Sequence, residues 1–399
     1  MTMAIMRVTH YDFAAVLLGV VMLTLGCDEP TAPPIHVDPP GAIEISAATT
    51  GVDLDPAGYD VEVFFPTVPS STHIRVPSNG TATLSGLIPG IYGLRISMVP
   101  NCDPVNPSPP TIPVSAGSTT PVTLYVTCVV PTQLAFVEGA SGDADIYVVN
   151  SNGTGYSRIT TQPGADVNPA WSPDGSRIAF ASERDGNSEI YVMSANGTNP
   201  VRLTNVAAAD YRPAWSPDGA RIAFVSEREG NAEIYAMNAD GTSPTRLTSH
   251  SANDRDPAWS PDGSKIAFVT NRDGNPQIYV MAANGSGLTR LTCCNSPDTW
   301  PVWSPDGTKI AFSRGASSLS SQIYVMNADG SGITPLTVSG SNGSDPAWSP
   351  DGRKIALTTR YSGFYCYDTF CSYIQIVRTN GAPYSLTIGE LASEPAWRP

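Results

Sequence analysis

A seven-residue phrase, Pro-Ala-Trp-Ser-Pro-Asp-Gly, recurs through the C-terminal two thirds of this 399-residue chain. One copy has Val in place of Ala, and a shortened copy ends the sequence. The marker tryptophans are Trp171, Trp215, Trp259, Trp303, Trp348 and Trp397, at spacings of 44, 44, 44, 45 and 49 residues. A period in the forties with four strand-like segments per unit predicts the blades of a β-propeller.

Each unit supplies four short strands. The tryptophan segment comes first, followed by Arg-Ile-Ala-Phe, Ile-Tyr-Val-Met and Arg-Leu-Thr or their variants. Asp-Gly and Asn-Gly pairs separate the segments, and these residues tolerate the positive φ of tight hairpin turns. Only 15% of the residues are charged, whereas Gly (35) and Pro (37) are abundant, as an all-β chain with many turns requires.

The two ends of the array complement each other. From Gln133 the chain supplies a second, third and fourth strand without a first, and after Thr387 it supplies a first strand without successors. The two fragments together make one blade. The sequence therefore predicts six blades, with the ring closed by the C-terminal strand so that no sheet edge stays open.

The pattern Trp-Ser-Pro-Asp-Gly-x-x-Ile-Ala-Phe followed by Ile-Tyr-Val-Met-Asn-Ala-Asp-Gly resembles the repeat of TolB-type propellers. TolB is the periplasmic component of the Tol–Pal envelope system. The same repeat occurs in the propellers of prolyl-oligopeptidase-like peptidases and in surface lipoproteins. The resemblance covers residues 131–399 and implies a non-catalytic binding scaffold in the envelope. TolB itself has a different N-terminal domain and is usually not lipidated, so the resemblance is one of architecture.

The N-terminus indicates export. Residues 13–25 form a 13-residue apolar stretch, which is too short for a comfortable membrane span and suits the core of a signal peptide. The segment Leu23-Thr24-Leu25-Gly26-Cys27 resembles the lipobox of bacterial lipoproteins, which implies acylation of Cys27. We expect a signal peptide at 1–27, a Pro-rich tether at 28–41 and a lipid-anchored protein facing the periplasm or the cell surface. Secretion without a lipid is the alternative.

Residues 42–128 contain seven short alternating segments, typical of an immunoglobulin-like or transthyretin-like β-sandwich. The segment from Leu84 to Tyr92 resembles the Leu-x-Gly-Leu-x-Pro-Gly-x-Tyr signature of carboxypeptidase-regulatory-like modules, which are usually spacers or adhesion elements. The predicted fold is thus all-β, with a small sandwich preceding a six-bladed propeller.

The remaining six cysteines favour an oxidising compartment. Proximity in the sequence favours the pairs Cys102–Cys128 and Cys366–Cys371 as disulfides. The pairing of the adjacent Cys293 and Cys294 stays open. No cysteine pair has zinc-ligand spacing with histidines nearby.

Charge limits the partners. Asp and Glu outnumber Lys and Arg by 36 to 22, for a net charge of −14, and no basic stripe stands against it. Such a surface repels phosphate backbones, so nucleic acid is excluded as a partner. We expect a monomer that contacts the membrane only through its lipid and binds envelope or surface proteins or peptides. We expect no cofactor, with Ca²⁺ at the channel mouth as an open alternative.

Acids and arginines recur near one mouth of the predicted channel. The acids lie before each tryptophan, five residues before it in four blades and shifted in the last two: Asp166, Asp210, Asp254, Asp298, Asp345 and Glu394. The arginines follow the second strands: Arg184, Arg228, Arg272, Arg314 and Arg360. The main interpretation is an alternating ring that ties the blades together, because buried charges need partners. The alternative is a cation or basic-peptide site.

An insertion from Tyr361 to Tyr373 carries further candidates. Its aromatics Tyr365, Tyr367 and Phe370 lie in or beside the loop between Cys366 and Cys371. Rigid aromatics on a stapled loop suit recognition. Packing over blade edges is the equal alternative.

Catalytic signals are few. Of four histidines only His250 lies in the propeller, and no Gly-x-Ser-x-Gly elbow occurs. The chain is therefore predicted not to be an enzyme. The leading hypothesis is a protein- or peptide-binding envelope propeller, and the alternative is a glycan-binding or carboxylate-based glycan-cleaving propeller. An unpaired carboxylate couple in the channel would favour the alternative. A fully paired ring with an apolar rim would favour protein binding.

Overall fold

The computed structural model describes residues 38–51, 59–65, 71–97, 102–104, 111–128, 132–140, 142–151, 153–293, 296–315, 320–338, 340–361, 371–379, 387–388 and 391–399. Every regular element in these ranges is a β-strand, as predicted. No helix in this part of the chain is long and apolar enough to cross a membrane. The lipidation candidate Cys27, the tether up to residue 37 and residues 362–370 of the insertion lie outside the described residues.

The N-terminal part contains two four-stranded sheets. The first has the order β4-β1-β8-β6 and the second β3-β2-β5-β7. The strands are β1 (Gly41–Gly51), β2 (Tyr59–Phe64), β3 (Ser71–Val76), β4 (Thr81–Leu87), β5 (Gly90–Ser97), β6 (Cys102–Pro104), β7 (Ile112–Val114) and β8 (Thr119–Cys128). Ile45 and Leu124 of the first sheet and Val61 and Tyr92 of the second are buried in one shared core. A relationship to immunoglobulin-like or carboxypeptidase-regulatory-like modules stays a prediction.

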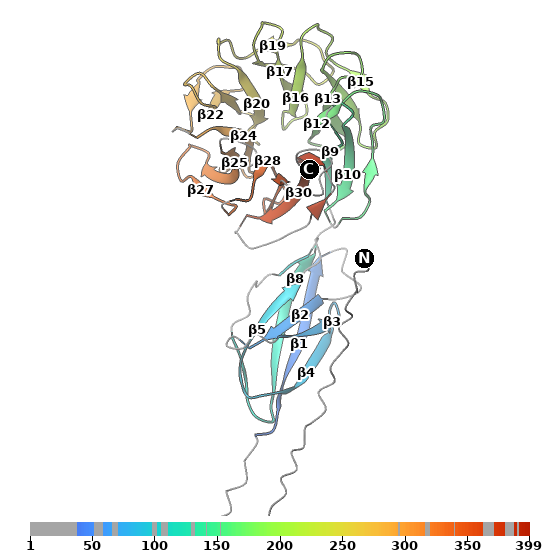
Figure 1. Cartoon of the computed structure of the whole chain (residues 1–399), viewed down its shortest axis with the longest axis vertical. Helices are drawn as coiled ribbons and strands as arrows, with labels where there is room; N and C mark the ends of the chain where they lie inside the picture. The colour runs from blue at the N-terminus through green and yellow to red at the C-terminus, as the bar shows by residue number, and fades with distance from the viewer. Residues whose placement is uncertain are drawn as a thin grey trace, which may run out of the picture.

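The C-terminal part is a ring of six four-stranded blades (Figure 1), which confirms the predicted propeller. Blade 1 is β12 (Asp166–Trp171), β13 (Arg177–Ser182), β14 (Glu189–Ser194) and β15 (Val201–Arg202). Blade 2 is β16 (Asp210–Trp215), β17 (Arg221–Ser226), β18 (Glu233–Asn238) and β19 (Thr245–Arg246). Blade 3 is β20 (Asp254–Trp259), β21 (Lys265–Thr270), β22 (Gln277–Ala282) and β23 (Thr289–Arg290).

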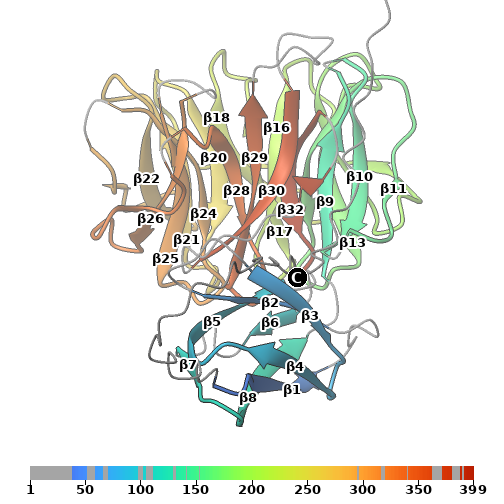
Figure 2. The ribbon, with the colours of Figure 1, turned by 60° about the horizontal axis from the view of Figure 1, so that its bottom comes forward.

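The remaining blades follow the same order. Blade 4 is β24 (Asp298–Trp303), β25 (Lys309–Arg314), β26 (Gln322–Asn327) and β27 (Thr334–Pro335). Blade 5 is β28 (Gly343–Trp348), β29 (Lys354–Tyr361), β30 (Cys371–Arg378) and β31 (Thr387–Ile388). Blade 6 is composite: β32 (Ala392–Trp397) pairs with β9 (Gln133–Glu138), which continues to β10 (Asp145–Asn150) and β11 (Ser157–Arg158). The predicted closure by the C-terminal strand is confirmed, and β32 and β9 run side by side in Figure 2.

Each marker tryptophan joins two blades. The indole Nε1 of Trp215 donates to the carbonyl oxygen of Ala170 in the preceding blade at 3.1 Å, and Trp171 donates in the same way to Ala396 across the closure. The apolar cores also lie between blades, since Phe180 of blade 1 packs in one cluster with Ile146 of blade 6. The tryptophan repeat is therefore a repeat of the interface between blades.

The Asp of each Ser-Pro-Asp-Gly turn is a structural residue. Oδ1 of Asp174 accepts hydrogen bonds from Ser172 Oγ at 2.5 Å and from the backbone N–H of Ser176 at 3.0 Å. Gly175 then takes a φ of 65°, which Gly adopts without steric cost. This arrangement agrees with turn chemistry as the reason for the repeat.

Candidate functional site

Four of the predicted acids pair with the predicted arginines. We call Asp166, Asp210, Asp254 and Asp298 the rim acids, and all four are fully buried. Their partners are Arg184, Arg228, Arg272 and Arg314, at N–O distances of 3.0, 2.9, 3.0 and 2.7 Å. A buried carboxylate is costly unless it is paired. These ion pairs therefore offset the desolvation cost of burying the four acids.

The side-chain pairs close within single blades, which corrects the expectation of a side-chain ring between blades. Arg184 bonds Asp166 of its own blade and stacks over Tyr191 of the same blade at 4.8 Å. The link to the preceding blade is made by the backbone, where the N–H of Asp166 donates to the carbonyl oxygen of Ala144 at 2.7 Å. The rim acids therefore hold strands together, and each pairs with an arginine, although Oδ1 of Asp210 has no hydrogen-bond partner among the described residues.

Asp345 and Glu394 do not belong to this set. In blades 5 and 6 the rim-acid position, five residues before the tryptophan, is taken by Gly343 and Ala392. The two carboxyls sit three residues before the tryptophan, inside the channel. The expectation that the acid of the last two blades is shifted along the same rim is thus corrected.

That third position before the tryptophan has an unusual backbone in every blade. The six residues are Asn168 (φ 54°), Arg212 (53°), Asp256 (57°), Trp300 (52°), Asp345 (49°) and Glu394 (54°). We call them the channel ring. Each stands at a register shift of the innermost strand, such as that between Val167 and Ala170, which marks a β-bulge. A positive φ costs a non-glycine residue about 1 kcal/mol, and such outliers concentrate at functional sites.

The bulges aim the channel ring into a cavity of about 350 Å³ on the propeller axis. Prolines that follow the ring residues, such as Pro213 and Pro301, form much of its wall. Nε of Arg212 contacts Oδ1 of Asp256 at 3.0 Å, and the guanidinium lies 5.6 Å from the centre of the Trp300 ring. The cavity wall thus combines tryptophans, one arginine and several carboxyls.

Side chains of the ring also link neighbouring blades. Oε2 of Glu394 accepts from the backbone N–H of Asn168 at 2.7 Å, and Oδ1 of Asn168 accepts from the backbone N–H of Arg212 at 3.3 Å. Trp300 differs, because its buried Nε1 has no hydrogen-bond partner among the described residues. A buried donor without an acceptor is costly.

Three carboxyls share the single arginine of the ring. Burial raises the pKa of Asp345 and of Glu394 above their usual range, although the charge of Arg212 opposes the shift in both. Burial also disfavours the charged form of Arg212. The charges of Asp256, Glu394 and Asp345 together outweigh this effect, so the pKa of Arg212 is raised. The cavity therefore has more acidic than basic groups, and a basic ligand would stabilise the carboxylates.

The other predicted residues fall elsewhere. Arg360 lies near Asp345, and its charge opposes the rise that burial causes in the pKa of Asp345. Tyr365, Tyr367, Phe370 and Cys366 lie outside the described residues, and of Cys371 only the backbone is described. The β6–β8 register places Cys102 directly opposite Cys128, and the disulfide itself stays a prediction. His250 is exposed. Among the described residues, no group of three or more His, Cys, Asp or Glu could hold a metal ion.

Sequence reasoning missed Asn168, Arg212, Asp256 and Trp300. A signal for them was present: each precedes the proline of the repeat, and this position changes its chemistry from blade to blade whereas its neighbours repeat.

Comparison with known proteins agrees with this architecture. A family model described as the TolB beta propeller domain matches residues 131–211, 203–318 and 257–399. A search of curated proteins gave no match.

Solved structures show the same fold at low sequence identity. TolB from Acinetobacter baumannii is 24% identical, with a TM-score of 0.56 over 67% of each chain. A TolB of Agrobacterium tumefaciens is 24% identical, with a TM-score of 0.51 over 65% of this chain and 89% of its own. Hydrazine synthase of Kuenenia stuttgartiensis is 15% identical, with a TM-score of 0.55 over 67% of this chain and 47% of its own. Such different proteins on one fold show that function has to be argued from the site.

Proposed function

The chain belongs to the TolB β-propeller family, and on that premise we propose that it is a non-catalytic envelope protein that binds a protein or peptide in the axial cavity of its propeller. The supporting observation is the channel ring. Six equivalent residues share one strained backbone conformation, yet they are an amide, a cation, an aromatic and three acids. A position that is fixed in geometry and varied in chemistry is suited to specific recognition, because the blades themselves do not need the variation.

The chemistry of the cavity favours a peptide that carries a basic group. Asp256, Asp345 and Glu394 provide three carboxyls against the one cation of Arg212. An ammonium or guanidinium group would pair with this excess. The ion pairs of the rim acids agree with a binding role, because they fix the strands around that part of the channel mouth.

We also propose that the protein is exported and anchored by a lipid on Cys27. The support is the sequence of residues 13–27 and the envelope location that the TolB name implies for relatives. The Pro-rich segment at 28–41 would then hold the folded part away from the bilayer.

The test is a photocrosslink from inside the channel in intact cells. Trp300 is replaced by a photoreactive phenylalanine analogue, and Val201, which is 56% exposed on an outermost strand, is replaced in the control. We expect a discrete crosslinked envelope protein from position 300 and none from position 201. Asp345→Asn combined with Glu394→Gln should weaken that crosslink, because it removes two acceptors of the basic group. Equal products from both positions would contradict binding in the channel.

A glycan-cleaving propeller is the second candidate, and one observation favours it. Asp345 and Glu394 form a couple of carboxyls in the channel with raised pKa values, and glycoside hydrolysis uses one protonated and one ionised carboxyl. Its test is release of reducing ends from envelope polysaccharides by the purified protein. Release that the Glu394→Gln variant loses would establish this candidate and overturn the non-catalytic role.

A further inference from the structure

The clefts between blades on the Ser-Pro-Asp-Gly face contain a second feature, independent of the channel. The first residue of each second strand is basic in blades 1 to 5: Arg177, Arg221, Lys265, Lys309 and Lys354. This residue stands beside the marker tryptophan of the next blade.

Where the residue is arginine, the tryptophan is covered. The guanidinium carbon of Arg177 lies 4.7 Å from the centre of the Trp215 ring, and that of Arg221 lies 5.7 Å from Trp259. At the ring closure, where blade 6 has Gln133 at this position, Arg398 supplies the same cover at 5.2 Å from Trp171. Three interfaces between blades thus contain the same guanidinium–indole stack, built from two different parts of the sequence.

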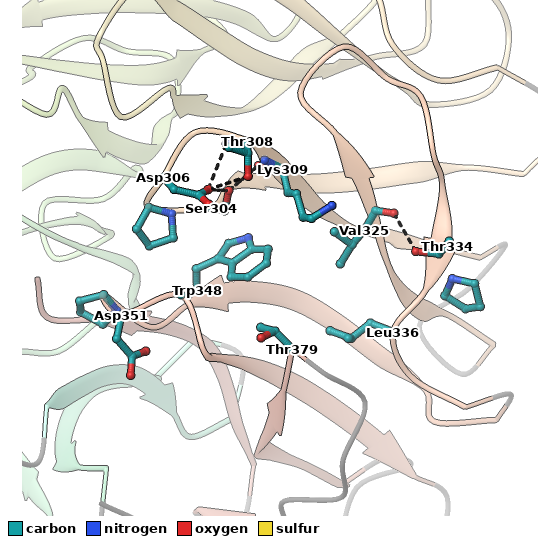
Figure 3. Close-up of a pocket in the computed structure, with 14 residues that line it drawn as sticks. Ser304, Asp306, Thr308, Lys309, Val325, Thr334, Leu336, Trp348, Asp351 and Thr379 are labelled. Carbon is teal, nitrogen blue, oxygen red and sulfur yellow. Dashed lines mark hydrogen bonds between the residues drawn. The ribbon is translucent and has the colours of Figure 1, made fainter. Parts of the chain in front are cut away.

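Beside two of the lysines there are cavities. One of about 400 Å³ lies beside Lys265 and Trp303, and one of about 850 Å³ lies between blades 4 and 5 beside Lys309 and Trp348. Figure 3 shows the larger cavity, with the Trp348 ring at its centre and Lys309 extending past it. Nζ of Lys309 bonds Oδ1 of Asn327 in its own blade at 3.3 Å, so this lysine does not take the place of the arginine.

The wall of the larger cavity suits a cation with an aliphatic stem. Pro305, Pro350 and Leu336 give it apolar sides. The hydroxyl of Ser304, with the backbone and hydroxyl of Thr308, holds the pKa of Asp306 below its usual range, so this carboxylate is ionised at neutral pH. These bonds end on Oδ1, and within the described residues Oδ2 of Asp306 accepts none.

We propose that this cavity between blades 4 and 5 is a binding site for an arginine side chain presented by a partner polypeptide. The chain itself shows what fits over the marker tryptophan, since its own arginines fill three equivalent interfaces. A planar, weakly hydrated guanidinium stacks on an indole better than an ammonium does. The carboxylate of Asp306 then faces the incoming charge. The site lies at the blade interface and does not depend on binding in the axial channel.

The test uses short peptides and the indole N–H signals of the isotopically labelled protein. The probes are acetyl-Gly-Arg-Gly-amide and its citrulline and lysine counterparts. We expect the arginine peptide to shift the Trp348 indole signal saturably, and the citrulline peptide, which has the shape without the charge, to bind at least tenfold more weakly. Lys309→Arg should fill the cavity from within, as Arg177 and Arg221 do in their blades, and weaken peptide binding at least tenfold. Lys265→Arg, one blade away, is the matched control and should leave it unchanged.

Each result supports or overturns the site. Saturable binding lost in Lys309→Arg and kept in Lys265→Arg supports it. No saturable shift of the Trp348 signal, or equal binding of the three peptides, or unchanged binding in Lys309→Arg, would overturn it. A thermal melt of both variants serves as the check on folding, and arginine at this position is already tolerated in blades 1 and 2.

Discussion

The backbone N–H of Asn168 donates a hydrogen bond to Oε2 of Glu394, which lies 226 residues further along the chain, at 2.7 Å. This contact joins the first blade to the strand that ends the sequence. Trp171 reinforces it by donating to the carbonyl oxygen of Ala396, and Trp397 donates to Ala347 of blade 5. The last strand therefore connects to both of its neighbours as well as to β9.

Deleting residues 394–399 should open the ring. The deletion removes the buried Trp397 and two of the four register pairs with β9. Loss of a large buried aromatic alone costs about 3–5 kcal/mol, and the exposed edge of β9 invites aggregation. We expect a melting temperature lower by about 10 °C and oligomers in size-exclusion chromatography. Deletion of Pro399 alone is the control. A monomer with an unchanged melting temperature would contradict the role of the closure.

Arg272→Met should destabilise the propeller strongly. It leaves the fully buried carboxylate of Asp254 without its partner at 3.0 Å. Removing one member of a buried pair costs about 3–5 kcal/mol. The exposed Arg255 of the same blade is the control, and Arg255→Ala should change the stability by less than about 0.5 kcal/mol. Denaturant unfolding measures both, and equal effects would show that the rim pairs contribute little.

Stability should depend on pH through Asp345 and Glu394. Burial raises the pKa of both in the folded protein. The folded state therefore holds protons that the unfolded state releases, and this contribution is present below the ordinary pKa near 4 and is lost as the pH rises through the folded value. Asp345→Asn with Glu394→Gln should flatten the fall in melting temperature on going from pH 4 to neutrality. An unchanged slope in the double variant would count against raised pKa values.

The turn aspartates provide a control of opposite sign. Hydrogen bonds from Ser260 and Ser264 lower the pKa of Asp262 to about 2. Its contribution is present above the ordinary pKa and is lost as the pH falls toward 2. Asp262→Asn should therefore lower stability at neutral pH, reduce the further loss of stability below about pH 4, and leave the slope between pH 4 and neutrality unchanged in denaturant unfolding.

Cys27→Ser should release the protein from the membrane fraction. The predicted lipid on this cysteine is the proposed anchor, and loss of the acyl chains removes the membrane affinity. Fractionation after a high-salt wash measures the change, with radiolabelled palmitate as a direct readout of acylation. A variant that stays with the membrane after the wash would rule out this lipid as the anchor.

The fold could be predicted because the information is periodic. Six tryptophans at near-constant spacing determine the number of blades, and the two incomplete ends determine how the ring closes. Pairing of the rim acids with the arginines was also accessible, since the two positions recur together. Placing those pairs within a blade required the strand register, in which Asp166 lies opposite Ser182, two residues from Arg184.

The channel ring could not be predicted in the same way. Its residues are defined by a positive φ at a β-bulge. Non-glycine residues such as Arg212 and Trp300 disfavour this backbone conformation. A sequence does not show the bulge, so from the sequence alone Asp345 and Glu394 are interpreted as displaced members of the acid repeat. The stacking of arginine on tryptophan could not be predicted for another reason. Arg177 and Trp215 belong to different repeats and come into contact only in the assembled ring.

The composite sixth blade has a consequence for how the propeller can be rebuilt. Because β32 and β9 are neighbours in one sheet, the location of the chain ends is set by covalent connectivity and not by the packing of the ring. A circular permutant of the propeller that joins residue 399 to residue 132 through a short linker and opens at the Asn-Gly turn of blade 1 keeps every strand pairing of the propeller. Moving the ends around the ring would separate the contribution of each interface to cooperative folding.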